Sequence, residues 1–195
     1  MNETMPDLDG EIARLEQSLV ETRAKLAELR RKRPAEAVKD YTLVGWDGGP
    51  LHLWELFGEK KDLIVVHNMG SMCPYCTMWA DGFNGIVHHL ESRAAFVVVS
   101  PDAPDTQRKF AESRGWKFRM ASSRGSTFTQ DMGYETVDGK KLPGASIFHQ
   151  PHDGGVQRVA RASFGPRDEY CSAWHFFDLL DGGAKEWEPH FRYGS

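Results

Sequence analysis

The stretch that decides the fold is Leu63–Phe83, "LIVVHNMGSMCPYCTMWADGF". Its first residues are β-rich and almost wholly apolar, which is typical of a strand buried on both faces. Cys73 and Cys76 follow, separated by two residues, where the pattern changes to that of a helix. Such a pair is a redox couple, half of a metal site, or two core thiols, and the rest of the sequence helps to discriminate among them.

Composition sets the class of protein. The 195 residues are enough for one domain of ordinary size, with 40% hydrophobic and 27% charged residues, as in a globular protein. The formal net charge of −4 gives no reason to expect nucleic acid as a partner. No apolar run approaches the ~20 residues of a membrane helix, so we expect no membrane partner either.

The cysteine count bears on the compartment. Three cysteines do not make a disulfide scaffold. The N-terminus, "MNETMPDLDG", is acidic and lacks the apolar core of a signal peptide. We therefore expect a cytoplasmic protein, where a close cysteine pair is catalytic or metal-binding rather than structural.

Residues 8–33 predict an amphipathic helix. Its apolar residues alternate at spacings of three and four, with Thr22 in one place of the series: Ile12, Leu15, Leu19, Leu26 and Leu29. This is an a/d seam over about three heptads; Asp9 is placed to cap its start and Pro34 to end it. The helix either lies on its own domain or pairs with a second copy, and we favour a homodimer through residues 8–33. We divide the chain into residues 1–39, this helix and a linker ("RPAEAVKD"), and residues 40–195, a globular domain.

The middle of the chain alternates strands and helices. "DLIVVHNM" and "AAFVVVS" predict buried strands, and "TMWADGFNGIVHHLESR" and "PDTQRKFAESRG" predict helices. Two buried strands joined by a crossover helix imply a parallel pair in an α/β sheet. Upstream, "HLWELFG" predicts a short helical turn.

The last third is more varied. "WKFRMASSRGSTFTQDMGYETVDGK" is irregular and polar, and long loops in compact domains are often functional. "GASIFHQ" and "GGVQRVARASFG" predict an antiparallel hairpin around an "HDGG" turn. "RDEYCSAWHFFDLLDGG" predicts a closing helix.

The order strand, Cys-x-x-Cys, helix supplies a chemistry. Cys73 falls at or before the first helical turn, where free backbone N–H groups and the helix dipole favour a thiolate. The thiolate is the reactive species of a cysteine. Pro74 suits an opening helical position, and Cys76, one turn later, can attack a mixed disulfide on Cys73.

The rival interpretations of the pair are less supported. Two core thiols would have to be placed by coincidence at a strand-to-helix junction. Zinc needs about four ligands, yet Cys171 lies alone near the C-terminus and there is no second Cys-x-x-Cys and no His-x(3–5)-His pair. No dinucleotide, P-loop or nucleophile-elbow motif is present. We expect no metal and no cofactor.

With the strand, the pair, the crossover helix and Pro143 in place, the chain resembles the thioredoxin-like superfamily. The resemblance implies a three-layer α/β fold with a mixed central sheet, here preceded by the long N-terminal helix. It also implies a cis bond before Pro143, which would face the cysteines and pair with an extended substrate. Pro74 and Tyr75 match the inner dipeptide of glutaredoxins, but Leu142 and Gly144 flank the proline unlike the glutaredoxin Thr-Val-Pro.

A closer resemblance is to the bacterial thioredoxin-like family named domain of unknown function 899. It covers nearly the whole chain and rests above all on "CPYCTMWADGFNG", "SSRGSTFTQDMG" and "LPGASIFHQ". Members are described as predicted thiol–disulfide oxidoreductases, an inference from fold that does not by itself establish function. The resemblance places a polar loop near the cysteines and makes four of its residues candidates for the substrate groove: Ser123, Ser126, Phe128 and Asp131. Trp79 either covers the pair or fills the core.

These observations lead to one main hypothesis and three rivals. The main one is a thiol–disulfide oxidoreductase: Cys73 attacks, Cys76 resolves, Pro143 shapes the groove, and the partner is a disulfide-containing protein or a small thiol or disulfide. The first rival is a non-catalytic or redox-sensing interaction module. Zinc binding and peroxide reduction are lesser rivals; peroxiredoxins generally carry Thr or Ser three positions before the reactive cysteine, where Gly70 stands.

Overall fold

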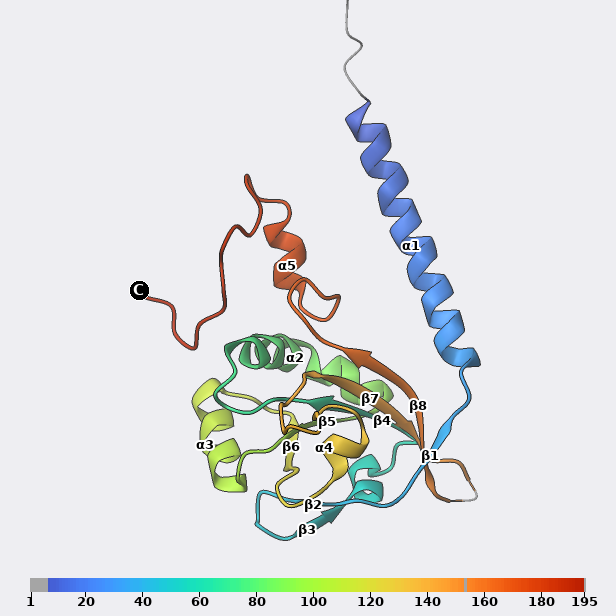
Figure 1. Ribbon diagram of the computed structural model, residues 1–195, viewed down its shortest axis with the longest axis vertical. Coiled ribbons are helices and arrows are strands. Elements are labelled where there is room, and N and C mark those ends of the chain that lie inside the picture. Colours follow the sequence, from blue (N-terminus) through green and yellow to red (C-terminus); the bar gives the residue numbers. More distant parts are fainter. Residues whose placement is uncertain (1–6, 153, 195) are drawn as a thin grey trace, which may run out of the picture.

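The protein is built on one mixed β-sheet (Figure 1). The computed structural model describes residues 7–152 and 154–194. The strands are β1 (Glu36–Val38), β2 (Thr42–Val44), β3 (Pro50–His52), β4 (Asp62–His67), β5 (Ala95–Ser100), β6 (Arg119–Ser122), β7 (Gly144–His149) and β8 (Val156–Ser163). The helices are α1 (Leu8–Lys32), the 3₁₀ helix η1 (Leu53–Phe57), α2 (Pro74–Arg93), α3 (Pro104–Arg114), α4 (Phe128–Asp131) and α5 (Ser172–Phe177). In the described part of the chain the sheet order is β1-β8-β7-β4-β5-β6-β2-β3.

The centre of the sheet confirms the predicted parallel pair. β4 and β5 run parallel, with Val65 opposite Val97, and α2 makes the crossover between them. β7 lies antiparallel on the other side of β4 and pairs with β8 as the predicted hairpin. Gly144 lies opposite His67, so β7 starts beside the carboxyl end of β4.

Successive residues of the central strands point to opposite faces, so the sheet carries two cores. Val66 and Val98 pack with α2 and α3 on one face. Val65 and Val97 pack with η1 and α4 on the other. Figure 1 shows α2 above the sheet and α4 below it. The result is the α/β fold with a mixed sheet and helices on both faces that the resemblance implied.

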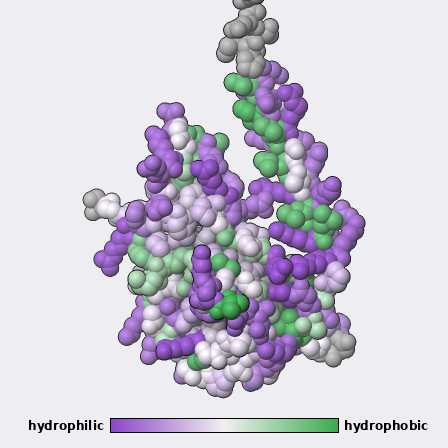
Figure 2. All heavy atoms as spheres, viewed as in Figure 1, coloured by the Kyte–Doolittle hydropathy of each residue, from purple (hydrophilic) through white to green (hydrophobic). Residues whose placement is uncertain are grey.

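The N-terminal helix stands apart from this body. None of the residues of α1 is buried, and Figure 2 shows apolar residues along its length, open to solvent. Its cap is Asp7, whose carboxylate accepts the Gly10 N–H at 3.0 Å, and not Asp9 as predicted. No helix in the described ranges is long and apolar enough to cross a membrane.

Three local predictions are wrong. The predicted linker contains β1, which pairs with β8. A strand of three residues is too short to show a pattern of its own, and the partner strand defines it. The predicted long loop contains β6 and α4. The closing helix spans only Ser172–Phe177, because Asp168 accepts the N–H of Tyr170 at 2.9 Å and holds the chain in a turn. In the predicted "HDGG" turn, Asp153 lies outside the described residues.

Candidate dithiol active site

Cys73 is the N-cap of α2. Its backbone is extended, Pro74 opens the helix, and its Sγ accepts the backbone N–H of Cys76 at 3.0 Å. Thr77 donates both its N–H and its hydroxyl to the Cys73 carbonyl, each at 3.0 Å. The cap sulfur therefore occupies the place of the oxygen of a capping serine, in contact with a donor at the positive end of the helix.

Cys76 is buried one turn further on, and the two thiols differ sharply. The Cys76 side chain donates a hydrogen bond that, with the backbone N–H groups of Cys76 and Tyr75, lowers the pKa of Cys73 against the effect of burial. The same hydrogen bond, burial and the charge of Cys73 raise the pKa of Cys76. Cys73 is half-buried and Cys76 is 2% exposed, so the thiol that ionises first is also the one that a substrate reaches.

The loop before the pair is held from the next strand. Asp102, just after β5, accepts the N–H of Ser71 at 2.7 Å, and Asn68 accepts that of Gly70 at 2.8 Å. Gly70 has φ +114°, and a Cβ there would lie 3.1 Å from Asp102 Oδ1, so the position requires glycine. In the sequence, one feature points to Asp102: it directly follows the predicted strand that became β5. The carboxyl ends of parallel strands lie side by side, so a residue after β5 lies close to the loop after β4.

Trp79 fills the core beneath the pair. Its ring is 3% exposed and packs 5.5 Å from Phe164 and 6.3 Å from Tyr75, centroid to centroid. Its indole N–H donates to Asp168 at 3.2 Å. Trp79 thus ties α2 to the segment after β8.

Pro143 and the cysteine pair lie at the same end of the central strands, because Gly144, next to Pro143, is opposite His67, the last residue of β4. The predicted cis bond is wrong: no peptide bond among the described residues is cis. The trans form is ordinarily favoured by ~0.5–1 kcal/mol. Hydrogen bonds on both sides of the bond hold it, from Leu142 N–H to the Tyr134 carbonyl at 2.8 Å and from Phe164 N–H to the Pro143 carbonyl at 3.0 Å.

The four predicted loop residues fall into two pairs at different places in the structure. Ser123 is buried at the sheet edge, its N–H bonded to the Ser100 carbonyl at 2.9 Å. Ser126 accepts the N–H of Phe128 at 3.3 Å and is partly exposed. Both belong to the turn that follows β6 and stay candidates for the groove.

The other two loop residues belong to α4, on the opposite face of the sheet. Phe128 is fully buried there, 5.1 Å from the Tyr41 ring and 5.4 Å from the His67 ring. Asp131 accepts the Tyr41 hydroxyl at 2.8 Å and pairs with Lys39 at 3.0 Å. Phe128 therefore packs in the core of that face, whereas Cys76 and Trp79 belong to the core on the α2 face; a place for Phe128 and Asp131 in the groove stays a prediction.

His67 is a buried polar residue that the sequence pattern did not distinguish from the strand around it. It is 2% exposed, its Nε2 lies 3.0 Å from the Ser146 hydroxyl, and its ring stacks 3.9 Å from that of Tyr134. Burial, and then the charge of Arg158, lower its pKa to about 3. The imidazole is therefore neutral and structural in character.

Cys171 is buried at the start of α5, where burial raises the pKa of its thiol. Within residues 7–152 and 154–194, no three His, Cys, Asp or Glu side chains gather as a metal site requires.

Comparison with known proteins adds the family and the fold. A family model described as a bacterial protein of unknown function, DUF899, matches residues 11–193. The chain is 26% identical to the chloroplastic peroxiredoxin Q of Populus jackii over 132 residues, which is 67% of the chain and 61% of the relative. The match therefore spans less than two thirds of that relative's length.

Solved structures are similar to the same part of the chain. The peroxidoxin BcpB of Mycobacterium tuberculosis is 26% identical, with a TM-score of 0.52 over 66% of this chain and 84% of that one. Reduced Prx3 of Vibrio vulnificus, in complex with H₂O₂, is 17% identical, with a TM-score of 0.55 over 68% and 88%. The chain thus has the thioredoxin-like fold of peroxiredoxins, and its cysteine pair supports a redox role.

Proposed function

The chain belongs to the DUF899 family of bacterial proteins of unknown function, and we propose that it is a thiol–disulfide oxidoreductase. One observation carries the proposal: the Cys73 sulfur caps α2 and accepts the Cys76 N–H at 3.0 Å, while the Cys76 thiol lies buried behind it. An exchange enzyme needs one accessible thiolate and one protonated thiol in reserve, and the two cysteines differ in that sense.

The reaction proceeds in two exchanges. The Cys73 thiolate attacks one sulfur of a substrate disulfide, the S–S bond breaks, and the released thiolate takes a proton from water. Once Cys73 is in the mixed disulfide it carries no charge, so one cause of the raised pKa of Cys76 is gone. Cys76 then loses its proton, attacks Cys73 and releases the second substrate thiol. Two electrons have passed to the substrate, and a dithiol donor must restore the pair.

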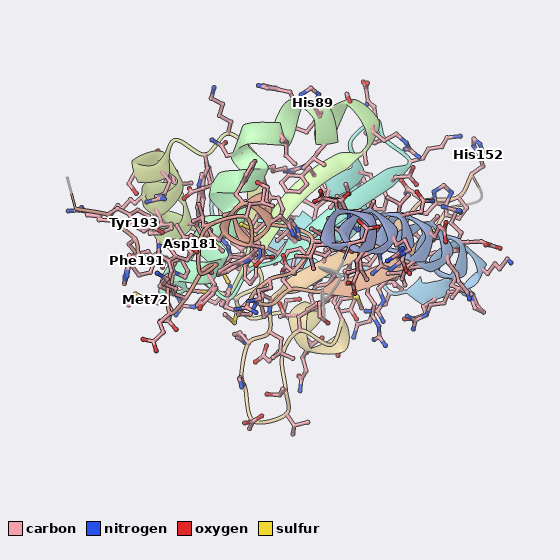
Figure 3. The ribbon with its side chains drawn as sticks, turned by 90° about the horizontal axis from the view of Figure 1, so that it is seen from above. Met72, His89, His152, Asp181, Phe191 and Tyr193 are labelled. Atoms are coloured by element: carbon pink, nitrogen blue, oxygen red, sulfur yellow. The ribbon has the colours of Figure 1, made fainter. Side chains whose placement is uncertain are left out.

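The surroundings of Cys73 favour a disulfide-containing protein or a small disulfide as the substrate. Met72, which precedes Cys73, is 85% exposed and lies at one end of the molecule in Figure 3. Tyr75 and Pro74 are partly exposed beside it. An exposed apolar rim around a reactive thiol offers contact area to a substrate chain.

A redox titration tests the proposal. The purified protein is equilibrated in glutathione buffers, alkylated and weighed by mass spectrometry. We expect Cys73 and Cys76 to interconvert as one two-electron couple, with a potential in the ~−270 to −120 mV range of such pairs, and Cys171 to stay alkylated throughout. Independent titration of the two thiols would contradict the proposal. A couple that forms but reduces no disulfide in turnover would favour a redox-sensing module instead.

Peroxide reduction is the second candidate, because the chain is 26% identical to two peroxiredoxins. In that reaction the Cys73 thiolate would take one oxygen from the peroxide, forming a sulfenic acid that Cys76 resolves with loss of water. At Gly70, where φ is +114° and a Cβ would lie 3.1 Å from Asp102 Oδ1, the hydroxyl residue that peroxiredoxins generally carry there would be strained. We therefore expect peroxide to oxidise Cys73 no faster than a free thiol of equal pKa, measured by stopped-flow peroxide consumption.

A further inference from the structure

An apolar pocket lies at the foot of α1, which Figure 1 shows beside β8. It has a volume of about 380 Å³, and its lining comes mainly from α2 and the strands β4, β5, β7 and β8. Most of these side chains are apolar, and Ile86 on α2 is 48% exposed among them. Arg30, in the last turn of α1, also lines the pocket. Exposed apolar surface of this kind marks a place where another surface packs.

One edge of α1 runs beside this pocket. Arg23 pairs with Glu169, a residue of the pocket, at 3.0 Å, and Arg30 lines the pocket itself. In the heptad pattern of the helix both arginines are e positions, and each follows a d position of the apolar seam, Thr22 or Leu29. A helix that packs along the seam would therefore lie next to the pocket.

The charges that flank the seam change sign along α1. The a positions of the seam are Ile12, Leu19 and Leu26, and its d positions are Leu8, Leu15, Thr22 and Leu29. The flanking residues are acidic or neutral in the first half of the helix and basic in the second half. They are Asp9, Glu16, Arg23 and Arg30 at the e positions, and Glu11, Ser18, Lys25 and Lys32 at the g positions. Charges at e and g set which partner a helix takes and in which orientation.

This order of charges favours two copies that run antiparallel. In an antiparallel pair, e positions face e positions and g positions face g positions. Asp9 of one copy then lies opposite Arg30 of the other, and Glu11 lies opposite Lys32. In a parallel pair, each g position faces an e position of the next heptad, which would place Glu11 against Glu16. Opposite charges stabilise a helix pair and like charges destabilise it.

The apolar residues of the seam agree with the same register. When the charges pair in this way, each layer of the seam joins an a position to a d position, as in Ile12 with Leu29 and Leu15 with Leu26. Leu8 then reaches the foot of the other copy's α1, where the pocket lies. Leu8 and Ile12 are 55% and 53% exposed, so both are free to pack against a second copy.

We propose that two copies of the chain dimerise antiparallel through α1, and that the first turn of each α1 covers the apolar pocket of the other copy. Leu8 would lie over the apolar lining, and Asp9 would lie against Arg30. Arg161 on β8 also lines the pocket and adds a second cation for the acidic turn. Because both copies make the same contact, the pair closes as a two-fold dimer. The described residues that line the pocket include no cysteine, so this surface lies apart from the dithiol and its test needs no redox activity.

Charge reversal tests the orientation. Asp9→Lys with Glu11→Lys should weaken the dimer at least about tenfold, because the pairs with Arg30 and Lys32, each made twice in the dimer, become repulsive. Arg30→Glu with Lys32→Glu should weaken it in the same way. Mixed together, the two double variants should pair about as tightly as the wild type, since opposite charges face each other again. Analytical ultracentrifugation at low salt, where exposed charges are least screened, measures each dissociation constant.

A control and a contrary outcome complete this test. Glu21→Lys with Glu28→Lys makes the same change of charge at exposed positions off the seam and should leave the dimer unchanged. A parallel dimer would respond in the opposite way, because Asp9→Lys with Glu11→Lys would remove the repulsion between Glu11 and Glu16 and tighten it. A tighter dimer in that variant, or a mixture of the two double variants that fails to pair, would overturn the antiparallel arrangement.

A photoreactive cross-linker tests the place of the first turn. A benzophenone side chain is introduced in place of Leu8, and nitrogen-15-labelled and unlabelled protein are mixed. We expect cross-links to residues of the pocket, such as Ile86 or Leu90 on α2, in peptide pairs that carry both isotopes. The same side chain in place of Glu21, off the seam, should give no cross-link between copies. The absence of cross-links between copies from position 8, or cross-links that join position 8 of one copy to position 8 of the other, would overturn the proposal.

Discussion

At the scale of the residue, the surroundings of Cys73 and Cys76 shift the pKa values of their two thiols in opposite directions. Cys73 accepts hydrogen bonds and Cys76 gives one. The difference arises from position on the helix: the cap lies beside free N–H groups, and the residue one turn on lies in the core. One residue type thus supplies two thiols of different acidity.

Loss of the Cys76 thiol should raise the pKa of Cys73, since its hydrogen bond is the first cause of the lowering. In Cys76→Ala we expect the midpoint of Cys73 alkylation to move to higher pH, with less thiolate at pH 7. Cys76→Ser keeps a donor and should move it less. The rate of iodoacetamide reaction across pH measures this, with Cys171→Ala as control. An equal midpoint in Cys76→Ala and the wild type would show that the backbone N–H groups suffice.

Gly70 should not tolerate a side chain. With φ +114° and Asp102 close to the site of a Cβ, Gly70→Ala should lower the free energy of unfolding by ~1–3 kcal/mol. Gly85→Ala is the matched control. It lies on α2 with no atom within 4 Å of its Cβ, and should raise stability by ~0.5–1 kcal/mol. Thermal unfolding compares the two, and equal effects would contradict the role of the Gly70 conformation.

The sequence predicts the residues whose roles are local. Cys73 and Pro74 carry helix-start signals within a few positions of one another, and both roles follow from that. Asp102 acts through Ser71, 31 positions away along the chain, and no local pattern encodes that distance. The same holds for Phe128 and Asp131: a polar loop could be recognised, but not the sheet face on which its residues lie.

At the scale of the element, predictions hold where the pattern is long. Apolar runs and helical spacing predict β4, α2, β5 and α3 with nearly their observed bounds. β1, β6 and α4 have three or four residues each, and such elements are defined by pairing and packing more than by their own sequence. In α5 the spacing predicts a longer helix than the one observed. The Asp168 carboxylate accepts the N–H of Tyr170 and forms a turn there, so the helix begins only at Ser172.

The β7–β8 hairpin depends on a close approach at Gly144. A Cβ there would overlap the Tyr134 ring and the Ala162 carbonyl oxygen, and the Tyr134 hydroxyl bonds the Ala145 carbonyl at 2.5 Å. Gly144→Ala should therefore cost ~1–3 kcal/mol of stability by overpacking. Gly165→Ala, with open space around it, should stay within ~0.5 kcal/mol of the wild type. Urea unfolding measures both; a neutral Gly144→Ala would mean that the ring moves aside without cost.

At the scale of the whole molecule, α1 is the part that one copy of the chain does not explain. Its seam residues Ile12, Leu15, Leu19 and Leu29 are 53–60% exposed. An ion pair between Arg23 and Glu169, 3.0 Å long and half-exposed at both ends, ties it to the domain. Most of the stability of a helix in a protein comes from packing its apolar face, and an exposed heptad seam is the pattern of a helix that pairs.

We therefore propose a homodimer through α1, in which the seams of two copies form a coiled coil. Leu15→Asp with Leu19→Asp should weaken the dimer at least about a hundredfold, from the apolar area lost, and lower the helical circular dichroism. Ala13→Asp with Val20→Asp adds the same charges off the seam, at exposed positions, and should preserve the dimer. Light scattering across concentration decides. A wild type that stays monomeric at high concentration would leave the seam to a different protein. The dithiol should react alike in both variants, because the Cys73 cap is built entirely within the sheet domain.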